Sequence, residues 1–224
     1  MIAHEIKRGE HNVLPLLQLL HGEGIECFIA GGFARWMLSP LEAPAYPSDI
    51  DIYFGNGTHR SDDVADILMK NGFNLVKNSR HAISLNPPEK GVFSDCIPIQ
   101  IIKAIANRFG DPDLVITGFD FTVVKAAVFL DKVGQQLLGI TSHAFLTDEQ
   151  NKQIVIDGIP NTFATLQRCF KYVEKGYKLA PRELLKILAH WDSLSVDKKV
   201  KLGNYVSGLV PATSTEFYDL LDTM

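Results

Sequence analysis

The sequence has few cysteines, no long apolar run and no excess of positive charge. Three cysteines among 224 residues, without CxxC spacing, argue against a disulfide framework or a zinc module, so we expect free thiols in a reducing cytoplasm. No apolar run reaches the roughly 18–20 residues that span a bilayer. The first residues also lack the order of a signal peptide. We therefore expect a cytoplasmic protein with no membrane partner.

The formal net charge of −4 disfavours a protein that coats nucleic acid along its whole surface. Hydrophobic residues make up 46% and charged residues 21%, a balance that excludes disorder as the dominant state. Charge is distributed unevenly, because residues 161–205 are net basic whereas residues 1–160 and 206–224 are net acidic. This asymmetry predicts either two surfaces with different ligands or ordinary lysines on exposed helix faces.

Local patterns predict an α/β (α+β) fold. Short or alternating apolar runs predict strands at residues 25–30, 50–54, 73–76, 81–85, 97–102, 119–130 and 136–140. Helical periodicity predicts helices at residues 11–21, 33–38, 61–71, 162–175 and 181–190, with two shorter helical stretches after them. We expect a mixed, mainly antiparallel sheet flanked by helices in residues 1–158, followed by a helical C-terminal region in residues 159–224.

The most informative local pattern is a pair of aspartates, Asp49 and Asp51, that alternate with isoleucines in a predicted strand. Residues i and i+2 of a strand share a face, so the two backbones are about 7 Å apart. Neighbouring carboxylates repel, and a divalent cation resolves the conflict. Mg²⁺, or Mn²⁺ in its place, prefers carboxylate oxygens and accepts substrate phosphates as further ligands. Chance alternation on a solvated strand is the alternative.

A second pattern lies upstream, where a predicted strand is followed by Gly31, Gly32 and a helix. Glycines at such a turn let a triphosphate approach the backbone, and the start of the helix presents free N–H groups to anions. Arg35 lies one helical turn further on and is placed to reach a phosphate. The combination with the aspartate pair predicts a nucleotide site.

Together, the segments Gly31–Arg35 and Pro47–Asp51 resemble the signature of the DNA polymerase beta-like nucleotidyltransferase superfamily. Within it they are most similar to the Gly-Gly-x-x-Arg-Asp head motif of poly(A) polymerases and CCA-adding enzymes. The resemblance covers residues 25–140 and implies the fold and the reaction type. It also implies that nucleotide is bound by Gly31, Gly32, Arg35 and Ser48. Trp36 stands where that motif has its aspartate.

The superfamily usually completes its metal site with a third acid on a neighbouring strand. We favour Asp120, an acid in an otherwise apolar predicted strand, because a charge there needs a partner or a purpose. The predicted metal ligands are thus Asp49, Asp51 and Asp120. Gln100 occupies the strand where many relatives carry the acid, and Asp95 is an alternative that also fits an ordinary turn.

A basic helix is the last candidate element. Arg168, Lys171 and Lys175 share one face of the predicted helix at residues 162–175, together with Tyr172. This face is suited to hold a triphosphate or an acceptor. The opposite face carries Phe163, Leu166, Phe170 and Val173, which we expect to be buried. A solvated amphipathic helix is the alternative.

These patterns predict a metal-dependent nucleotidyltransferase. It would transfer a nucleoside monophosphate from a nucleoside triphosphate, such as ATP, to a hydroxyl group and release pyrophosphate. The acceptor is left open among an RNA 3′ end or tRNA, a protein side chain and a small molecule. One alternative is a catalytically decayed nucleotide-binding or regulatory protein, suggested by Gln100 and Trp36. Another is a toxin-like transferase that modifies tRNA or a host protein.

Overall fold

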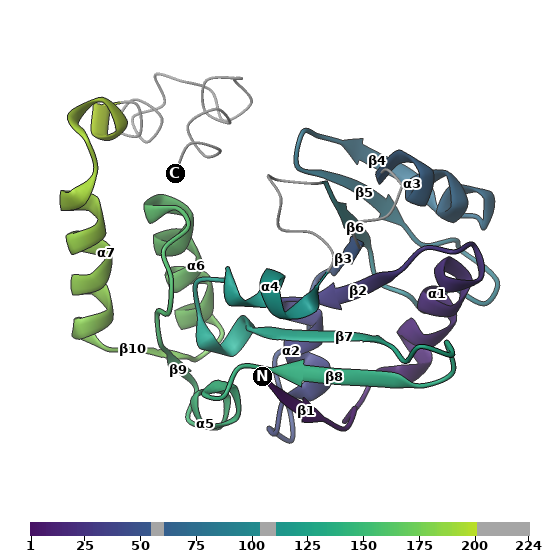
Figure 1. The fold of residues 1–224 in the computed structure, drawn as a ribbon, viewed down its shortest axis with the longest axis horizontal. Helices are drawn as coiled ribbons and strands as arrows, with labels where there is room; N and C mark the ends of the chain where they lie inside the picture. Colours follow the sequence, from purple (N-terminus) through teal and green to yellow (C-terminus); the bar gives the residue numbers. More distant parts are fainter. Residues whose placement is uncertain (55–60, 104–110, 201–224) are drawn as a thin grey trace.

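A computed structural model describes residues 1–54, 61–103 and 111–200 of the chain. Its centre is an eight-stranded sheet with the order β1-β8-β7-β2-β3-β6-β5-β4 (Figure 1). The strands are β1 (Ile2–His4), β2 (Cys27–Ala30), β3 (Ile50–Phe54), β4 (Asn74–Asn78), β5 (Ala82–Asn86), β6 (Ile99–Ile102), β7 (Ala126–Leu130) and β8 (Leu137–Thr141). Only the β3–β6 pair within this sheet is parallel. The expected mixed, mainly antiparallel fold is confirmed.

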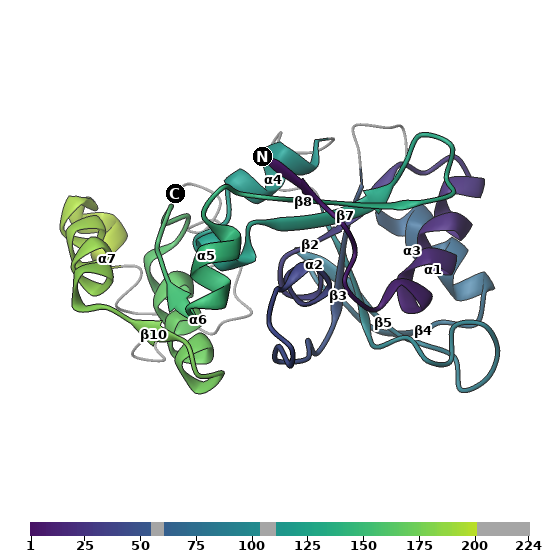
Figure 2. The same cartoon turned by 90° about the horizontal axis from the view of Figure 1, so that it is seen from below.

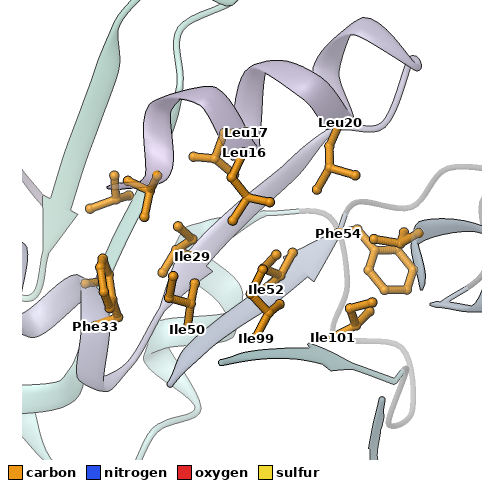
Figure 3. Close-up of a cluster of buried hydrophobic side chains, with 14 of the residues drawn as sticks. Leu16, Leu17, Leu20, Ile29, Phe33, Ile50, Ile52, Phe54, Ile99 and Ile101 are labelled. Atoms are coloured by element: carbon orange, nitrogen blue, oxygen red, sulfur yellow. The ribbon is translucent and has the colours of Figure 1, made fainter. Parts of the chain in front are cut away.

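Three helices pack on one face of this sheet: α1 (Glu10–Gly22), α2 (Gly32–Leu38) and α3 (Ser61–Lys70). Their apolar sides meet every second residue of the central strands, so one continuous core forms (Figure 3). Ile50 and Ile52 of β3 are fully buried there, beneath Leu16 and Leu20 of α1. This burial leaves the alternate residues of β3 to face the other side of the sheet.

The other face of the sheet carries a smaller helix, α4 (Pro112–Thr117). Val115 and Ile116 of α4 pack against Phe28 and Ala127 of the sheet. Figure 2 shows α4 and α2 on opposite sides of β7. Asp111 begins α4, since its carboxylate accepts the backbone N–H of Asp113.

The C-terminal elements are α5 (Phe145–Gln150), β9 (Gln153–Ile154), α6 (Thr162–Glu174), β10 (Lys178–Leu179) and α7 (Pro181–Ser193). β9 and β10 pair in parallel. A second apolar cluster joins α6 and α7 to the segment that precedes β7. This cluster contains Phe121, Val123, Cys169, Tyr172 and Ile187. The boundary expected at residue 158 stays a prediction, and residues 201–224 lie outside the described part.

The structure corrects the predicted strand at residues 119–130. Phe121 makes an isolated bridge to Ile156, residues Thr122–Val124 form a 3-10 turn, and β7 begins only at Ala126. Asp120 therefore lies before the turn and not within a strand. The missed elements are β1, α4, α5, β9 and β10, which are all short.

The prediction for the apolar side of α6 was wrong in part. Phe163 and Leu166 are partly buried, against Trp191 and the second apolar cluster, but Phe170 and Val173 are 58% and 44% exposed. The buried positions include Thr165, Cys169 and Tyr172, so hydrophobicity alone did not identify the interior stripe. In the described ranges, no helix combines the length and the apolar character that crossing a bilayer requires.

Candidate active site

Asp49 directly precedes β3 and Asp51 is its second residue, and both lie on the sheet face opposite α1. Ile50 and Ile52 point into the main core, so the two aspartates project to the other side, where both are half-buried. Burial, and after it the neighbouring charge of Asp49, raises the pKa of Asp51 to about 7. The charge of Asp49 therefore acts on the Asp51 carboxylate.

The turn at Gly31 lies directly beside Asp51. Gly31 has φ 79° and ψ −134°, a conformation that favours glycine. A Cβ atom on Gly31 would stand 3.7 Å from the Asp51 Oδ2 atom. Gly32 starts α2, and a Cβ there would meet open space. Gly32 and Asp49 are 17 positions apart in the sequence. The glycine turn and the aspartate pair nevertheless lie beside one another in the fold.

Two side chains hold the carboxylate of Asp49. The Gln100 Nε2 group donates to Asp49 Oδ2 at 2.6 Å, and the Ser48 hydroxyl donates to Asp49 Oδ1 at 3.1 Å. Gln100 lies on β6 directly opposite Asp51 in the parallel β3–β6 pair. Gln100 thus occupies a place beside both carboxylates, but as an amide it adds no negative charge. Asp95 lies in an exposed turn.

Basic residues at the C-terminal end of α6 act electrostatically on this pair of carboxylates. The charge of Lys171 opposes the upward shift in the pKa of Asp51, and the charge of Arg168 likewise acts on Tyr53. The pKa of Lys175 is lowered by burial and by nearby positive charge, an effect that Asp49 partly offsets. Two lysines therefore lie within electrostatic reach of the carboxylates.

Asp120 is not brought together with the aspartate pair. It is 3% exposed, and its Oδ2 atom accepts from Arg168 Nε at 2.5 Å. Among the described residues, no three His, Cys, Asp or Glu side chains converge as a metal site would require. The sequence predicts Asp120 as the third metal ligand. Its contacts support a different role, because its carboxylate neutralises the charge of Arg168 and orients that side chain.

Arg35 also lies elsewhere than its motif suggests. It is fully buried, and its Nη1 atom donates to Glu149 Oε1 at 2.9 Å and to the Tyr177 hydroxyl at 2.8 Å. Its Nη2 atom donates to the Ala45 carbonyl at 2.8 Å. These contacts occupy the guanidinium inside the protein, so they do not support the expected contact with phosphate. Sequence reasoning missed Glu149 and Tyr177, which no local pattern marks.

The side chains at this place are of the kind that binds a divalent cation. Asp49 and Asp51 supply neighbouring carboxylate oxygens, and burial, followed by the charge of Asp49, raises the pKa of Asp51. Mg²⁺ is commonly held by one or two carboxylates, with waters and substrate phosphates as its other ligands. The residues present therefore fit a Mg²⁺ that arrives with a nucleotide.

A cavity of about 840 Å³ lies away from these residues, at the Cys27 end of β2. It lies between the end of α1 and the start of α4, and Phe28 and Phe129 contribute to its wall. The aspartate pair, Gly31, Gly32 and the lysines of α6 do not line it. The candidate site is thus the aspartate pair and not the large cavity.

Comparison with solved structures places the fold among CCA-adding enzymes. The Thermotoga maritima CCA-adding enzyme, solved in complex with tRNA, matches with a TM-score of 0.60 and 17% identity over 85% of this chain and 47% of its own. The Bacillus stearothermophilus enzyme, solved with CTP, gives a TM-score of 0.55 at 17% identity over 86% and 47%. A tRNA-processing enzyme in an apo form gives 0.57 at 16% over 89% and 54%.

At this identity the likeness concerns the fold alone, and the chain spans about half the length of these enzymes. A comparison with curated proteins finds no match. A family model described as "Gad2: Gabija anti-defense 2 family protein" matches residues 4–158, which include the strands and the turn that carry the aspartate pair. This match covers more than half of the sequence, and the chain therefore belongs to the Gabija anti-defense 2 family.

Proposed function

We propose that this protein is a metal-dependent nucleotidyltransferase. It transfers a nucleoside monophosphate from a nucleoside triphosphate to a hydroxyl group and releases pyrophosphate. One observation carries the proposal: Asp49 and Asp51 project together beside the Gly31 turn, with Lys171 and Lys175 in electrostatic reach. Cation-binding groups, a close backbone approach and positive charge for phosphate are thereby gathered at one place.

Each residue has a distinct role in this proposal. Asp49 and Asp51 hold Mg²⁺, which when bound stabilises charge on the phosphates and promotes ionisation of the attacking hydroxyl. Ser48 and Gln100 keep the Asp49 carboxylate oriented through their hydrogen bonds. The remaining groups contact the triphosphate: the backbone at Gly31 and Gly32, and the ammonium groups of Lys171 and Lys175.

We infer a biological purpose from the family. A protein of the Gabija anti-defense 2 family that carries this site would counteract Gabija by attaching a nucleotide to a component on which the defence depends. The structural neighbours include enzymes solved with tRNA, CTP and ATP, which supports nucleoside triphosphates as donors and keeps RNA among the acceptors. A hydroxyl of a protein or of a small molecule is chemically equivalent as an acceptor.

A second candidate function is nucleotide binding without transfer. Two observations favour it: Gln100 is neutral at the position opposite Asp51, and no third acid joins the pair among the residues that the structure describes. A protein of this kind would bind Mg²⁺ and a nucleoside triphosphate and would release neither pyrophosphate nor a modified acceptor.

The test is incubation of the purified protein with each α-³²P-labelled nucleoside triphosphate, Mg²⁺ and an extract of cells that carry Gabija. Ribonuclease or protease treatment then identifies the labelled class of molecule. Asp49→Asn should abolish labelling, whereas Asp66→Asn, an exposed acid on α3, should leave it unchanged. Nucleotide binding without any labelled product would favour the second candidate, and absence of both would refute the two proposals.

A further inference from the structure

Arg35 belongs to a fully buried polar cluster that links distant parts of the chain. Glu149 of α5 accepts from Arg35 Nη1 at 2.9 Å and from the Ser39 hydroxyl at 2.7 Å through the same oxygen, Oε1. Its other oxygen, Oε2, accepts from the Tyr177 hydroxyl at 2.5 Å. Arg35, Ser39 and Glu149 are each 0% exposed. Such a cluster is stable only while its members satisfy one another.

One end of the cluster is fixed to the glycine turn. The backbone N–H of Arg35 donates to the Gly31 carbonyl at 2.8 Å, which makes it part of the first turn of α2. Anchoring the guanidinium therefore also restrains the backbone that lies beside Asp51.

The other end is fixed to the C-terminus of α6. Gly176, with φ 84°, ends the helix, and the backbone N–H of Tyr177 donates to the Tyr172 carbonyl at 3.0 Å. The N–H of Gly176 donates to the Val173 carbonyl at 2.9 Å, which completes a Schellman motif. The rings of Tyr172 and Tyr177 also pack edge to face, with centroids 5.0 Å apart. Tyr177 is thus rigidly joined to α6.

The same end of α6 carries Lys171 and Lys175. The Lys175 ammonium lies 5.2 Å from the centroid of the Tyr172 ring, and its pKa is lowered by burial and then by the charge of Arg35. A continuous chain of contacts therefore runs from the Gly31 turn through Arg35, Tyr177 and Tyr172 to Lys175.

We propose that Arg35 is a positioning residue, and that its bonds to Tyr177 and Glu149 hold the C-terminal end of α6 over the aspartate pair. This inference rests on the proposed function, because it concerns where the phosphate-binding lysines stand. It also reassigns the arginine of the head motif. Arg35 has no exposed surface through which to touch a triphosphate, so it acts through Lys171 and Lys175.

The experiment compares two variants, each of which removes one hydroxyl group that donates to Glu149. Tyr177→Phe cuts the link to α6, whereas Ser39→Ala removes a bond of similar length that does not involve α6. Substitution of Arg35 itself is unsuitable, because it would leave a buried carboxylate unpaired and strongly destabilise the fold. Binding of MgATP is measured by titration calorimetry, and hydrogen exchange of the amides in residues 171–175 is measured in parallel.

Tyr177→Phe removes the hydrogen bonds of this hydroxyl with Arg35 and Glu149. We expect it to weaken MgATP binding about three- to tenfold and to speed exchange at the end of α6. Ser39→Ala should leave both unchanged. Equal effects of the two variants on both measurements would overturn the inference, because a cluster that only stabilises the fold would respond in the same way to either substitution. If the wild-type protein fails to bind MgATP, the proposed function is refuted, and the exchange comparison alone decides the inference.

Discussion

Asp51→Asn should make the protein more stable at alkaline pH. The pKa of Asp51 is raised from 3.8 to about 7, first by burial and then by Asp49. The folded protein therefore holds this proton more tightly than the unfolded chain, so stability falls as the pH rises from about 4 to about 7 and is then constant. Asparagine carries no charge and removes this dependence.

The magnitude follows from the two pKa values. Each pH unit between them corresponds to about 1.4 kcal/mol, which gives an upper bound of ~4 kcal/mol at pH 8. Solvent reaches the half-buried side chain and screens its charge, so we expect a gain of ~2 kcal/mol at pH 8 and about a third of that at pH 5. Urea unfolding at the two pH values measures the difference.

Asp66→Asn serves as the matched control, because Asp66 is an exposed acid on α3. Mg²⁺ should stabilise the wild-type protein at pH 8 and have no effect on Asp51→Asn, since the variant lacks one of the two proposed ligands. A variant that is no more stable than wild type at pH 8, or a difference that does not change with pH, would refute the reasoning about the carboxylate pair.

Three further substitutions test the surroundings of the site. Gly31→Ala should weaken MgATP binding and destabilise the fold by about 1–3 kcal/mol, because of the positive φ and the nearness of Asp51; titration calorimetry with unchanged affinity would contradict this. Asn161→Ala should cost about 1 kcal/mol in urea unfolding, since Asn161 accepts from the first turn of α6; no loss would show that the cap is dispensable. Arg168→Ala should cost about 1–3 kcal/mol by leaving the buried Asp120 without its partner; a neutral result in the same assay would argue that water replaces the arginine.

Much of the site could be predicted from sequence because its signals are local. The alternation of Asp49 and Asp51 with buried isoleucines fixes the face of the strand, whatever packs on it. The glycine pair between a strand and a helix is likewise a local signal. The structure places these elements side by side, since β2 and β3 are neighbours in the sheet.

The misplaced residues depend on distant partners. Arg35 is buried because Glu149, 114 positions away, provides its counter-charge, and no local spacing contains that information. Asp120 was assigned to a strand because its neighbours are apolar, but Phe121 packs in a cluster with α6 and α7 and Phe119 packs beside α4. The buried face of α6 was misjudged for the same reason, because its packing partner and not its own hydrophobicity selects the stripe.

Transfer of the α-phosphate tests the central claim most directly. The purified protein, Mg²⁺ and a Gabija-containing extract are incubated in parallel with α-³²P-labelled and γ-³²P-labelled nucleoside triphosphate. The account predicts that the acceptor gains the α label and not the γ label, and that the double variant Asp49→Asn with Asp51→Asn gains neither. Transfer of the γ label, or α-label transfer that survives in the double variant, would contradict it.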